Sequence, residues 1–344
     1  MLVPPPCKYV EGTDDVWTVA RESLKNLQGI LIHGGPGNGK SYMVDTLLKE
    51  VPEDIPVHRM SRTHVTARTI KGDTTSHWLN RHSKGNLMTP CVVFVDELWL
   101  HEYNLLARLH AFSLLPDVCF ICTGDDLQLE SIGNLHGATE LSFEALGKSD
   151  MLKLMCPTQI ELVENKRSDP VIHAFVTKCR TKRKADVIDE GRATFKFDGE
   201  ADTHLVLSNA KRRRINIDRN EATRPPDARL LEANDSNIHL HVGLKLQGCN
   251  PVKSRGIANG ILYEITSLDK ETMTVKDEEG EYCVPYDFAK KAFRLAIART
   301  IFSVQSQTLQ GSVAIHDMDH PLTTEKHLLT AVSRATSYDK VRLE

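Results

Sequence analysis

The stretch Leu31–Met43 reads LIHGGPGNGKSYM and decides the fold of the first half of the chain. Gly34, four further residues and then Gly39-Lys40-Ser41 form the Walker A pattern GxxxxGK[ST], whose backbone N–H groups surround the phosphates of a nucleoside triphosphate. The lysine contacts the β- and γ-phosphates, and the serine hydroxyl binds Mg²⁺. Apolar residues 29–32 predict a strand before the loop, and residues 41–51 predict an amphipathic helix whose N-terminus points at the phosphates. The predicted nucleotide contacts are Gly34, Gly35, Pro36, Gly37, Asn38, Gly39, Lys40, Ser41 and Tyr42.

The composition is that of an ordinary soluble globular chain. Its 344 residues allow about two domains, with 40% hydrophobic and 26% charged residues and a net charge of −3. No apolar run has the roughly 18 residues that a membrane span needs, and residues 1–15 do not read as a secretory signal. We therefore expect an intracellular protein, in the cytoplasm or the nucleus, and no membrane partner. The nearly neutral charge neither indicates nor excludes nucleic acid, because a local cleft can be basic.

Two features leave alternatives open. The basic runs 178–184 (KCRTKRK) and 211–214 (KRRR) fit phosphate contacts or a nuclear-import signal, but solvated helix faces or loops are the commoner explanation. Cys119 and Cys122 have the spacing of a zinc pair, yet there is no second pair and the segment reads as an apolar strand, where residues i and i+3 face opposite sides. Buried free thiols explain these cysteines better than a metal does.

Strands and helices alternate through residues 1–150. A loose lead-in over 1–15 precedes a helix over 17–25, and strands follow near 57–60, at 91–95 and from 117 onward. The run at 91–95 is almost wholly apolar, which is typical of a buried parallel strand, and it ends in Asp96-Glu97. This order predicts an α/β fold with a doubly wound parallel sheet, whose ligand-binding residues lie at the carboxyl ends of the strands.

The second half of the chain, residues 151–344, starts a new α/β pattern. Residues 186–226 are polar and charged, residues 238–290 are β-rich with regular turns, and the last 50 residues return to α/β character. We therefore predict a first domain over 1–150 and a second over 151–344 that contains a β-rich insertion at about 238–290.

Two polar segments at predicted strand ends supply the chemistry that the Walker loop needs. Asp96 is placed to hold Mg²⁺ and Glu97 to polarise the attacking water, since they end a hydrophobic strand about 55 residues after Lys40. The next strand ends in TGDDLQLESI, where Gln128 is placed to detect the γ-phosphate. Together these residues predict a hydrolytic site rather than a simple nucleotide-binding turn.

In this order, the Walker loop, Asp96-Glu97 and GDxxQL resemble superfamily 1 helicases, in particular the RecD-like and Pif-type DNA helicases, including those of large DNA viruses. The resemblance runs over about residues 30–340. It includes THVTA at 63–67, GDT followed by His at 72–77, LVENKRSD, the NG-containing GIANGILYEI, ARTIFSVQSQTL and the closing LLTAVSRAT. By this resemblance the nucleic-acid contacts are Thr63, His64, Thr74, His77, Asn259, Thr300, Ser303, Gln305 and Thr308, and Trp78, which follows His77, is a further candidate.

The resemblance implies two RecA-like P-loop NTPase lobes with a small SH3-like insertion in the second. ATP and Mg²⁺ would bind between the lobes, with Lys40, Glu97 and Gln128 from the first and Arg167 and Arg334 from the second. It also implies a helicase that hydrolyses ATP to move 5′ to 3′ on single-stranded DNA and to open forked duplexes. Such an enzyme serves DNA replication, recombination or repair, with replication proteins among its partners. An RNA helicase of the viral superfamily 1 type and a nucleic-acid-binding NTPase switch without unwinding activity stay as alternatives.

Several residues depart from the family pattern. Phe302, Ser303 and Ser306 stand where the family has His, Lys and Gly, and Glu130 stands where it has Pro. No glutamine lies at the distance before the loop at which the family reads adenine, so we expect relaxed nucleotide selectivity. Trp78 fits two roles equally, stacking on a base or packing in the core.

Overall fold

The computed structural model describes residues 8–11, 15–125, 127–129, 135–136, 139–140, 143–166, 169–250 and 256–344. The chain forms two compact units, Met1–Ser168 and Asp169–Glu344. The expected boundary lay at 150/151. The observed one lies later because residues 158–162 form a strand of the first unit's sheet.

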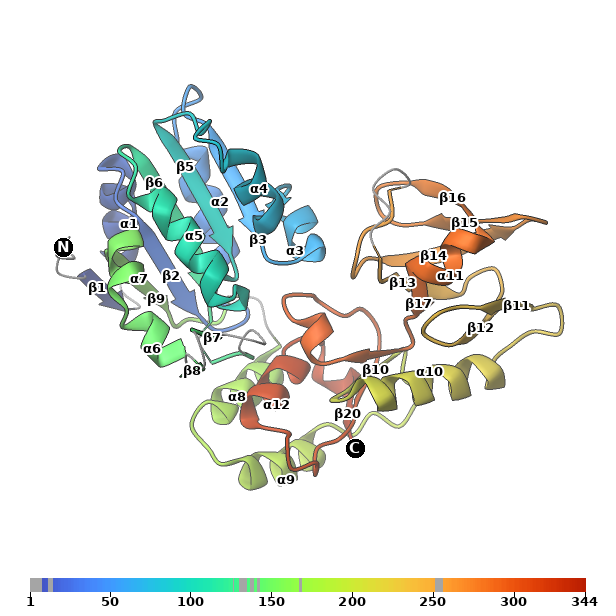
Figure 1. The fold of residues 1–344 in the computed structure, drawn as a ribbon. Helices are drawn as coiled ribbons and strands as arrows, with labels where there is room; N and C mark the ends of the chain where they lie inside the picture. The colour runs from blue at the N-terminus through green and yellow to red at the C-terminus, as the bar shows by residue number, and fades with distance from the viewer. Residues whose placement is uncertain are drawn as a thin grey trace. The chain divides into compact units, whose positions relative to one another are not determined.

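The first unit is built on a seven-stranded sheet in which every paired strand is parallel. The strands, in spatial order, are β1 (Lys8–Glu11), β9 (Thr158–Leu162), β2 (Ile30–Gly34), β6 (Val118–Gly124), β5 (Cys91–Asp96), β3 (Val57–Ser61) and β4 (Asp73–Thr74). The helices are α1 (Asp15–Lys25), α2 (Lys40–Lys49), α3 (His64–Thr69), α4 (Thr75–His82), α5 (Tyr103–Ser113), α6 (Phe143–Gly147) and α7 (Asp150–Met155). A short antiparallel pair, β7 (Leu135–His136) and β8 (Thr139–Glu140), lies apart from the sheet (Figure 1). The predicted α/β fold with a parallel sheet is confirmed.

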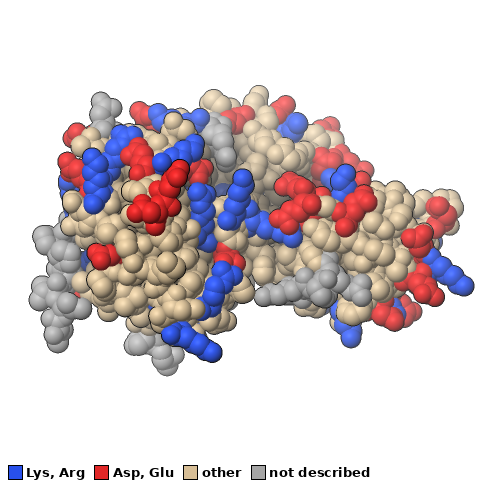
Figure 2. Space-filling model, turned by 90° about the horizontal axis from the view of Figure 1, so that it is seen from above, with Lys and Arg blue, Asp and Glu red and all other residues tan. Residues whose placement is uncertain are grey.

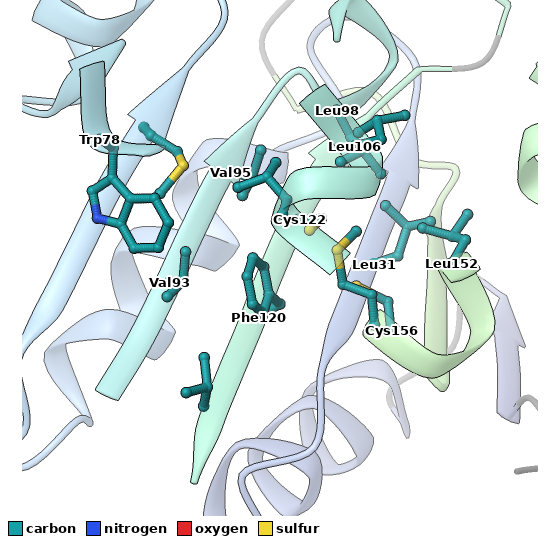
Figure 3. Close-up of a cluster of buried hydrophobic side chains, with 14 of the residues drawn as sticks. Leu31, Trp78, Val93, Val95, Leu98, Leu106, Phe120, Cys122, Leu152 and Cys156 are labelled. Carbon is teal, nitrogen blue, oxygen red and sulfur yellow. The ribbon is translucent and has the colours of Figure 1, made fainter. Parts of the chain in front are cut away.

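Both faces of this sheet are buried, which is why its central strands are apolar throughout. Alternate residues of each strand point to opposite faces. Val93 and Phe120 therefore join the cluster under α4, α5 and α7 (Figure 3), and Val92 and Ile121 join the cluster under α1 and α2. The two apolar clusters fix the central strands, so the strand ends have defined positions.

The second unit contains a four-stranded parallel sheet in the order β18 (Ala298–Thr300), β10 (Thr203–Val206), β19 (Val313–Ile315) and β20 (Val341–Leu343). Its helices are α8 (Pro170–Cys179), α9 (Lys184–Thr194), α10 (Asn209–Ala222), α11 (Tyr286–Ala292) and α12 (Glu325–Val332). Helices and strands therefore occupy much of the polar stretch 186–226. The strand β10 lies there, and three of its four residues are buried although the segment around it is charged.

The same unit has a β-rich part with its own apolar core. An antiparallel sheet has the order β16 (Glu281–Pro285), β15 (Thr272–Lys276), β14 (Leu262–Leu268), β13 (Lys245–Gly248) and β17 (Phe293–Leu295). A two-stranded pair, β11 (Arg229–Glu232) and β12 (Asn237–Leu240), precedes it. The β-rich part thus extends over 229–295, beyond both ends of the predicted 238–290.

Two further observations concern the ends of the predicted elements. The lead-in over 1–15 was predicted to be loose, but Lys8–Glu11 forms β1 and pairs with β9. This strand is largely exposed at the sheet edge, so it needs little apolar sequence and the hydrophobic pattern did not reveal it. Within the described part of the chain, no helix has both the length and the apolar character to cross a membrane.

Candidate nucleotide site and nucleic-acid contacts

The candidate site of the first unit lies along one edge of the parallel sheet. Strand pairing puts Gly34 beside Leu162, His33 beside Gly124, and Ser61 beside both Asp96 and Thr74. Carboxyl ends of parallel strands meet at the same edge, and ligands bind there in open α/β sheets. The Walker loop, the acidic pair and the threonine of the GDT segment therefore come from the ends of β2, β5 and β4 along the same edge of the sheet.

The loop after β2 requires its glycines. Gly37 and Gly39 have φ angles of 82° and 89°, in the left-handed region, and Gly34 has a φ of 148°. A Cβ on Gly34 would lie 2.6 Å from the carbonyl oxygen of Leu162. Helix α2 then begins at Lys40 with no side-chain cap at Gly39, so its first N–H groups are available to an anion.

The Walker loop is held by hydrogen bonds to β9 and to the segment after β9. The Asn38 side-chain amide donates to the carbonyl of Leu162 at 2.6 Å, and the Lys166 amide donates to the carbonyl of Gly37 at 2.9 Å. The Lys40 ammonium donates to the carbonyls of Gly34 at 2.6 Å and Gly35 at 3.1 Å. The lysine is thus held over its own loop by uncharged acceptors.

Ser41 and Tyr42 are both exposed on the first turn of α2. The Tyr42 side chain is 72% exposed, and its ring centroid lies 6.2 Å from that of Trp17 in an edge-to-face arrangement. Both side chains can therefore reach a ligand that enters from solvent.

Asp96 ends β5 and Glu97 follows it, on the far side of β6 from β2. Thr123 of β6 donates from Oγ1 to Asp96 Oδ1 at 2.6 Å. Burial, followed by the neighbouring Glu97 charge, raises the pKa of Asp96 to about 6, while the Thr123 hydrogen bond and the Lys40 charge act in the opposite direction. Thr123 has no signature of its own in the sequence, since it is one more residue of an apolar strand.

Glu97 has a left-handed backbone, with φ 52° and ψ 58°. A non-glycine residue in this region costs roughly 1 kcal/mol and is retained when the surrounding contacts determine it. Its carbonyl accepts hydrogen bonds from the Leu100 amide at 3.0 Å and from the His101 Nδ1 at 3.2 Å. The strained residue is thus the one predicted to polarise water.

Gln128 lies in the turn that follows β6 and is 2% exposed. Its Nε2 donates to Asp125 Oδ2 at 3.0 Å, and Asp125 Oδ1 accepts from the Leu127 amide at 3.2 Å. The Gln128 Oε1 is buried and has no hydrogen-bond partner within the ranges that the structure covers. An acceptor held in this way suits a sensor group, but Asp126 and Glu130 lie outside the described residues.

Three of the predicted nucleic-acid contacts lie at helix starts next to this edge. Thr63 caps α3, accepting from the Thr66 amide at 3.2 Å, and Thr74 caps α4, accepting from the His77 amide at 3.4 Å. His64 is the first residue of α3 and is half-buried. The His77 ring contacts Arg81 Nη2 at 2.9 Å on the outer side of α4.

Trp78 is a correction to the predicted contacts. Its side chain is 1% exposed and lies in the apolar cluster of Figure 3, with ring centroids 5.0 Å from Phe112 and 5.7 Å from His58. A ring enclosed on α4 in this way cannot stack on a base. Trp78 is a core residue, because α4 turns its apolar side toward the sheet.

Except for Asn259, the predicted contacts of the second unit lie at the end of β18 and in the turn that follows it. Ser303 is tied to Thr300, donating from its amide to Oγ1 at 3.2 Å and from its hydroxyl to the carbonyl at 2.8 Å. Gln305 is 6% exposed and Thr308 is exposed. Asn259 is exposed in the turn before β14. The structure thus brings Thr300, Ser303, Gln305 and Thr308 into one segment.

Arg334 follows α12 and is 6% exposed. Its guanidinium donates to the Thr330 carbonyl at 3.0 Å, the Ser333 hydroxyl at 2.7 Å and the Gln307 carbonyl at 3.3 Å. Arg334 is therefore fixed to the Thr300–Thr308 segment through Gln307. Arg167, the other predicted arginine, lies outside the described residues.

Sequence reasoning missed a second buried arginine in this segment. Arg299 is 1% exposed, and its Nη2 donates to Gln307 Oε1 at 2.7 Å. Burial, followed by the charge of Arg294, lowers its pKa to about 10. The sequence did not reveal this contact, because Arg299 lies within an apolar strand. The contact depends on how residues 303–307 fold back over the strand.

The basic runs are engaged in ion pairs. Lys178 and Lys182 both pair with Glu190, and Arg212, which is 2% exposed, pairs with Asp235 at 2.8 Å. On the face drawn in Figure 2, lysine and arginine side chains are interspersed with aspartate and glutamate. These contacts favour the structural explanation of both runs.

The cysteine pair lies in the core. Cys119 and Cys122 are both buried in β6 as free thiols. Burial, followed by the neighbouring Cys122 and Cys91, raises the pKa of Cys119 to about 12, so this thiol stays protonated and unreactive.

These features define a P-loop nucleoside triphosphatase: a parallel sheet, a Walker loop at its carboxyl edge and an acidic pair at the end of β5, the next strand but one in the sheet. The model of the viral superfamily 1 RNA helicase core domain matches residues 30–241. The chain belongs to this superfamily 1 helicase family and is an ATP-hydrolysing helicase. No curated protein sequence matches it.

Solved structures of Pif1 helicases share the fold. The Candida albicans enzyme is 15% identical with a TM-score of 0.70, covering 100% of this chain and 94% of its own. The Bacteroides enzyme in complex with ADP-AlF3 and single-stranded DNA is 16% identical with a TM-score of 0.68, covering 96% and 92%. A structure of two coordinating Pif1 helicases, described for DNA unwinding at forked duplex, is 16% identical with a TM-score of 0.70, covering 96% and 91%. At this identity the likeness establishes the fold.

Proposed function

We propose that the chain is an ATP-dependent DNA helicase that moves 5′ to 3′ on single-stranded DNA and opens forked duplexes. The observation that carries the proposal is the row of strand ends in the first unit. Along one edge of the sheet it gives the Walker loop after β2, Asp96 at the end of β5, and the threonine caps of α3 and α4 at the ends of β3 and β4, next to β5. Nucleotide hydrolysis and the gripping of a strand would thus share one edge of one sheet.

The residues present fit ATP with Mg²⁺. Among the residues that the structure describes, the acceptors of the Lys40 ammonium are the carbonyls of Gly34 and Gly35, so its charge is available to phosphate oxygens, and the uncapped start of α2 offers further N–H donors. Ser41 and Asp96 would hold the metal, since hydroxyl and carboxylate oxygens are ligands that Mg²⁺ prefers. When bound, Mg²⁺ neutralises phosphate charge and positions the β- and γ-phosphates.

The remaining side chains have complementary roles in hydrolysis. Glu97 orients and polarises the attacking water, and Gln128, held by Asp125, detects the γ-phosphate. Arg334 stabilises the charge of the transition state, as does Arg167 by resemblance. Because Arg334 is bonded to Gln307 within the Thr300–Thr308 segment, a strand bound at that segment would alter its position.

The DNA preference is supported by the near full-length likeness to Pif1 structures, two of which are described with DNA. An RNA helicase is the second candidate, because the family that matches this chain is described as a viral RNA helicase core domain. A switch without unwinding is the third, because Phe302, Ser303 and Ser306 replace the family's His, Lys and Gly. Replication proteins would be partners of the DNA helicase, which would act in the nucleus or in the cytoplasm.

One pair of assays separates the three candidates. ATP hydrolysis is measured with single-stranded DNA and RNA of the same sequence, and strand separation with forks carrying a 5′ or a 3′ tail. We expect greater stimulation by DNA and unwinding of the 5′-tailed fork. Greater stimulation by RNA supports the RNA helicase, and stimulation with no unwinding of DNA or RNA supports the switch.

A further inference from the structure

His101 connects the hydrolytic end of β5 to the start of α4. It follows the 3-10 helix Leu98–Leu100 and is fully buried. Its Nδ1 lies 3.0 Å from the Leu98 carbonyl and 3.2 Å from the Glu97 carbonyl, and its Nε2 lies 2.7 Å from Thr75 Oγ1. Carbonyl oxygens only accept, so Nδ1 carries the proton and Nε2 accepts from the threonine hydroxyl. Burial lowers the pKa of His101 to about 4, which keeps this neutral tautomer at physiological pH.

Thr75, the threonine at the other end of this bond, is buried behind the predicted strand contacts Thr74 and His77 and is not itself one of them. Thr75 is the first residue of α4 and is fully buried. It directly follows Thr74, the cap of α4, whose hydroxyl accepts from the His77 amide. A displacement of Thr74 or His77 by a bound strand would therefore move Thr75 and, through its hydroxyl, the imidazole of His101.

The imidazole acts on a residue whose backbone is strained. The backbone of Glu97 has the left-handed conformation, and His101 Nδ1 is one of the donors to its carbonyl. The surrounding contacts keep Glu97 in this left-handed conformation. Movement of the His101 donor would therefore change how often Glu97 adopts it. We infer that His101 is a positioning residue that couples strand contact at Thr74 and His77 to the orientation of Glu97. This inference rests on the proposed function.

Thr75→Val tests the coupling because it removes the hydroxyl and leaves the His101 contacts to Glu97 in place. We expect nucleic-acid-stimulated kcat to fall about fivefold or more, with basal hydrolysis, KM for ATP and strand affinity changed less than about twofold. Thr75→Ser keeps the hydroxyl and is expected to restore stimulation. Stimulated hydrolysis, basal hydrolysis, strand affinity and thermal unfolding are measured for each variant.

Thr158→Val is the matched control. It breaks a buried hydroxyl–hydroxyl bond of 2.8 Å to Ser23 in the same unit. It is expected to lower stability as Thr75→Val does, while stimulation stays as in the wild type. His101→Asn provides a second test if Thr75→Val does not fold, since Asn keeps a donor but is too short to reach Thr75.

The outcomes separate this inference from the proposed function. A wild-type chain whose hydrolysis is not stimulated by DNA or RNA contradicts the proposed function. A stimulated wild type whose folded Thr75→Val or His101→Asn variant is stimulated equally contradicts the inference. Equal loss in Thr75→Val and Thr158→Val also contradicts it, because the effect would then come from stability alone.

Discussion

The two units hold their predicted functional residues in different ways. In the first unit the backbone sets the main positions, since Asp96 lies opposite Ser61 at a strand end and Lys40 opens the helix that follows β2, and side-chain bonds such as Thr123 to Asp96 add to this placement. In the second unit side chains do so: Arg334 is held by Thr330, Ser333 and Gln307. Residues placed by sheet register tolerate change around them, whereas residues placed by side-chain hydrogen bonds depend on each partner.

The largest expected effect comes from Lys40→Ala in the first unit. Without the ammonium, nothing on the loop replaces its charge at the β- and γ-phosphates, so we expect hydrolysis to fall on the order of 10³-fold. Steady-state ATPase assays measure this, with the exposed Lys49→Ala at the end of α2 as control. Retained hydrolysis in Lys40→Ala would contradict the assignment of the site.

Trp78→Ala sharpens the claim that the first unit's core fixes its strand ends. Removing a fully buried indole is expected to lower the free energy of unfolding by about 3–5 kcal/mol, as measured by denaturant titration. Trp78→Phe keeps most of the packing, so its affinity for a single strand should match the wild type. A tenfold loss of affinity in a stably folded Trp78→Phe would show that the ring stacks on a base after all.

Arg334→Lys tests the second unit's dependence on side-chain geometry. Lysine keeps the charge but lacks the planar guanidinium that donates to both the Ser333 hydroxyl and the Gln307 carbonyl. We therefore expect kcat to fall about 10²-fold with little change in KM. Arg342→Lys, on β20 of the same unit, is the control. A kcat within twofold of the wild type would exclude Arg334 from the transition state.

Stability at acid pH offers a test in the second unit. Burial, followed by the charge of His316, lowers the pKa of His204 to about 4 from an ordinary 6.5. As the pH falls, His204 is protonated in the unfolded chain before it is protonated in the folded one. The free energy of unfolding that depends on neutral His204 is therefore retained above about pH 6.5 and declines as the pH falls toward 4. At pH 5 the loss from this group is about 2 kcal/mol.

Urea unfolding between pH 4.5 and 7 measures this decline. His204→Gln is expected to flatten the pH dependence, and the exposed His320→Gln is the control. An equal slope in wild type and His204→Gln would mean that His204 is not the titrating group.

The smallest effect is expected at Tyr42. Its exposed ring directly follows Ser41, so Tyr42→Ala should raise KM for ATP about threefold with kcat unchanged, through loss of one aromatic contact. Tyr338→Ala, an exposed tyrosine of the second unit, should change neither constant. An unchanged KM in Tyr42→Ala would remove this residue from the nucleotide contacts.

The comparison of the units also explains what the sequence could predict. The Walker loop, the strand ending in Asp96 and the order of elements in the first unit were predictable, because glycine spacing and apolar runs are local signals. Thr123, His101 and Arg299 were not, since each acts through a partner on another element. The strand β10 was missed because its four residues lie within a charged segment.

Trp78 illustrates the limit most clearly. A tryptophan on an amphipathic helix has the same pattern whether it stacks on a base or packs in a core. Only its contacts with His58 on β3 and Phe112 on α5 decide between the two. The other nucleic-acid contacts, and the roles of Arg167 and Arg334, stay predictions.

Strand separation on a forked DNA duplex with a 5′ single-stranded tail tests the central claim most directly. With ATP and Mg²⁺, the wild-type chain is expected to release the displaced strand, whereas Lys40→Ala and the wild type without ATP leave the fork intact. ATP hydrolysis by the wild type without strand release from DNA forks of either polarity would contradict the account.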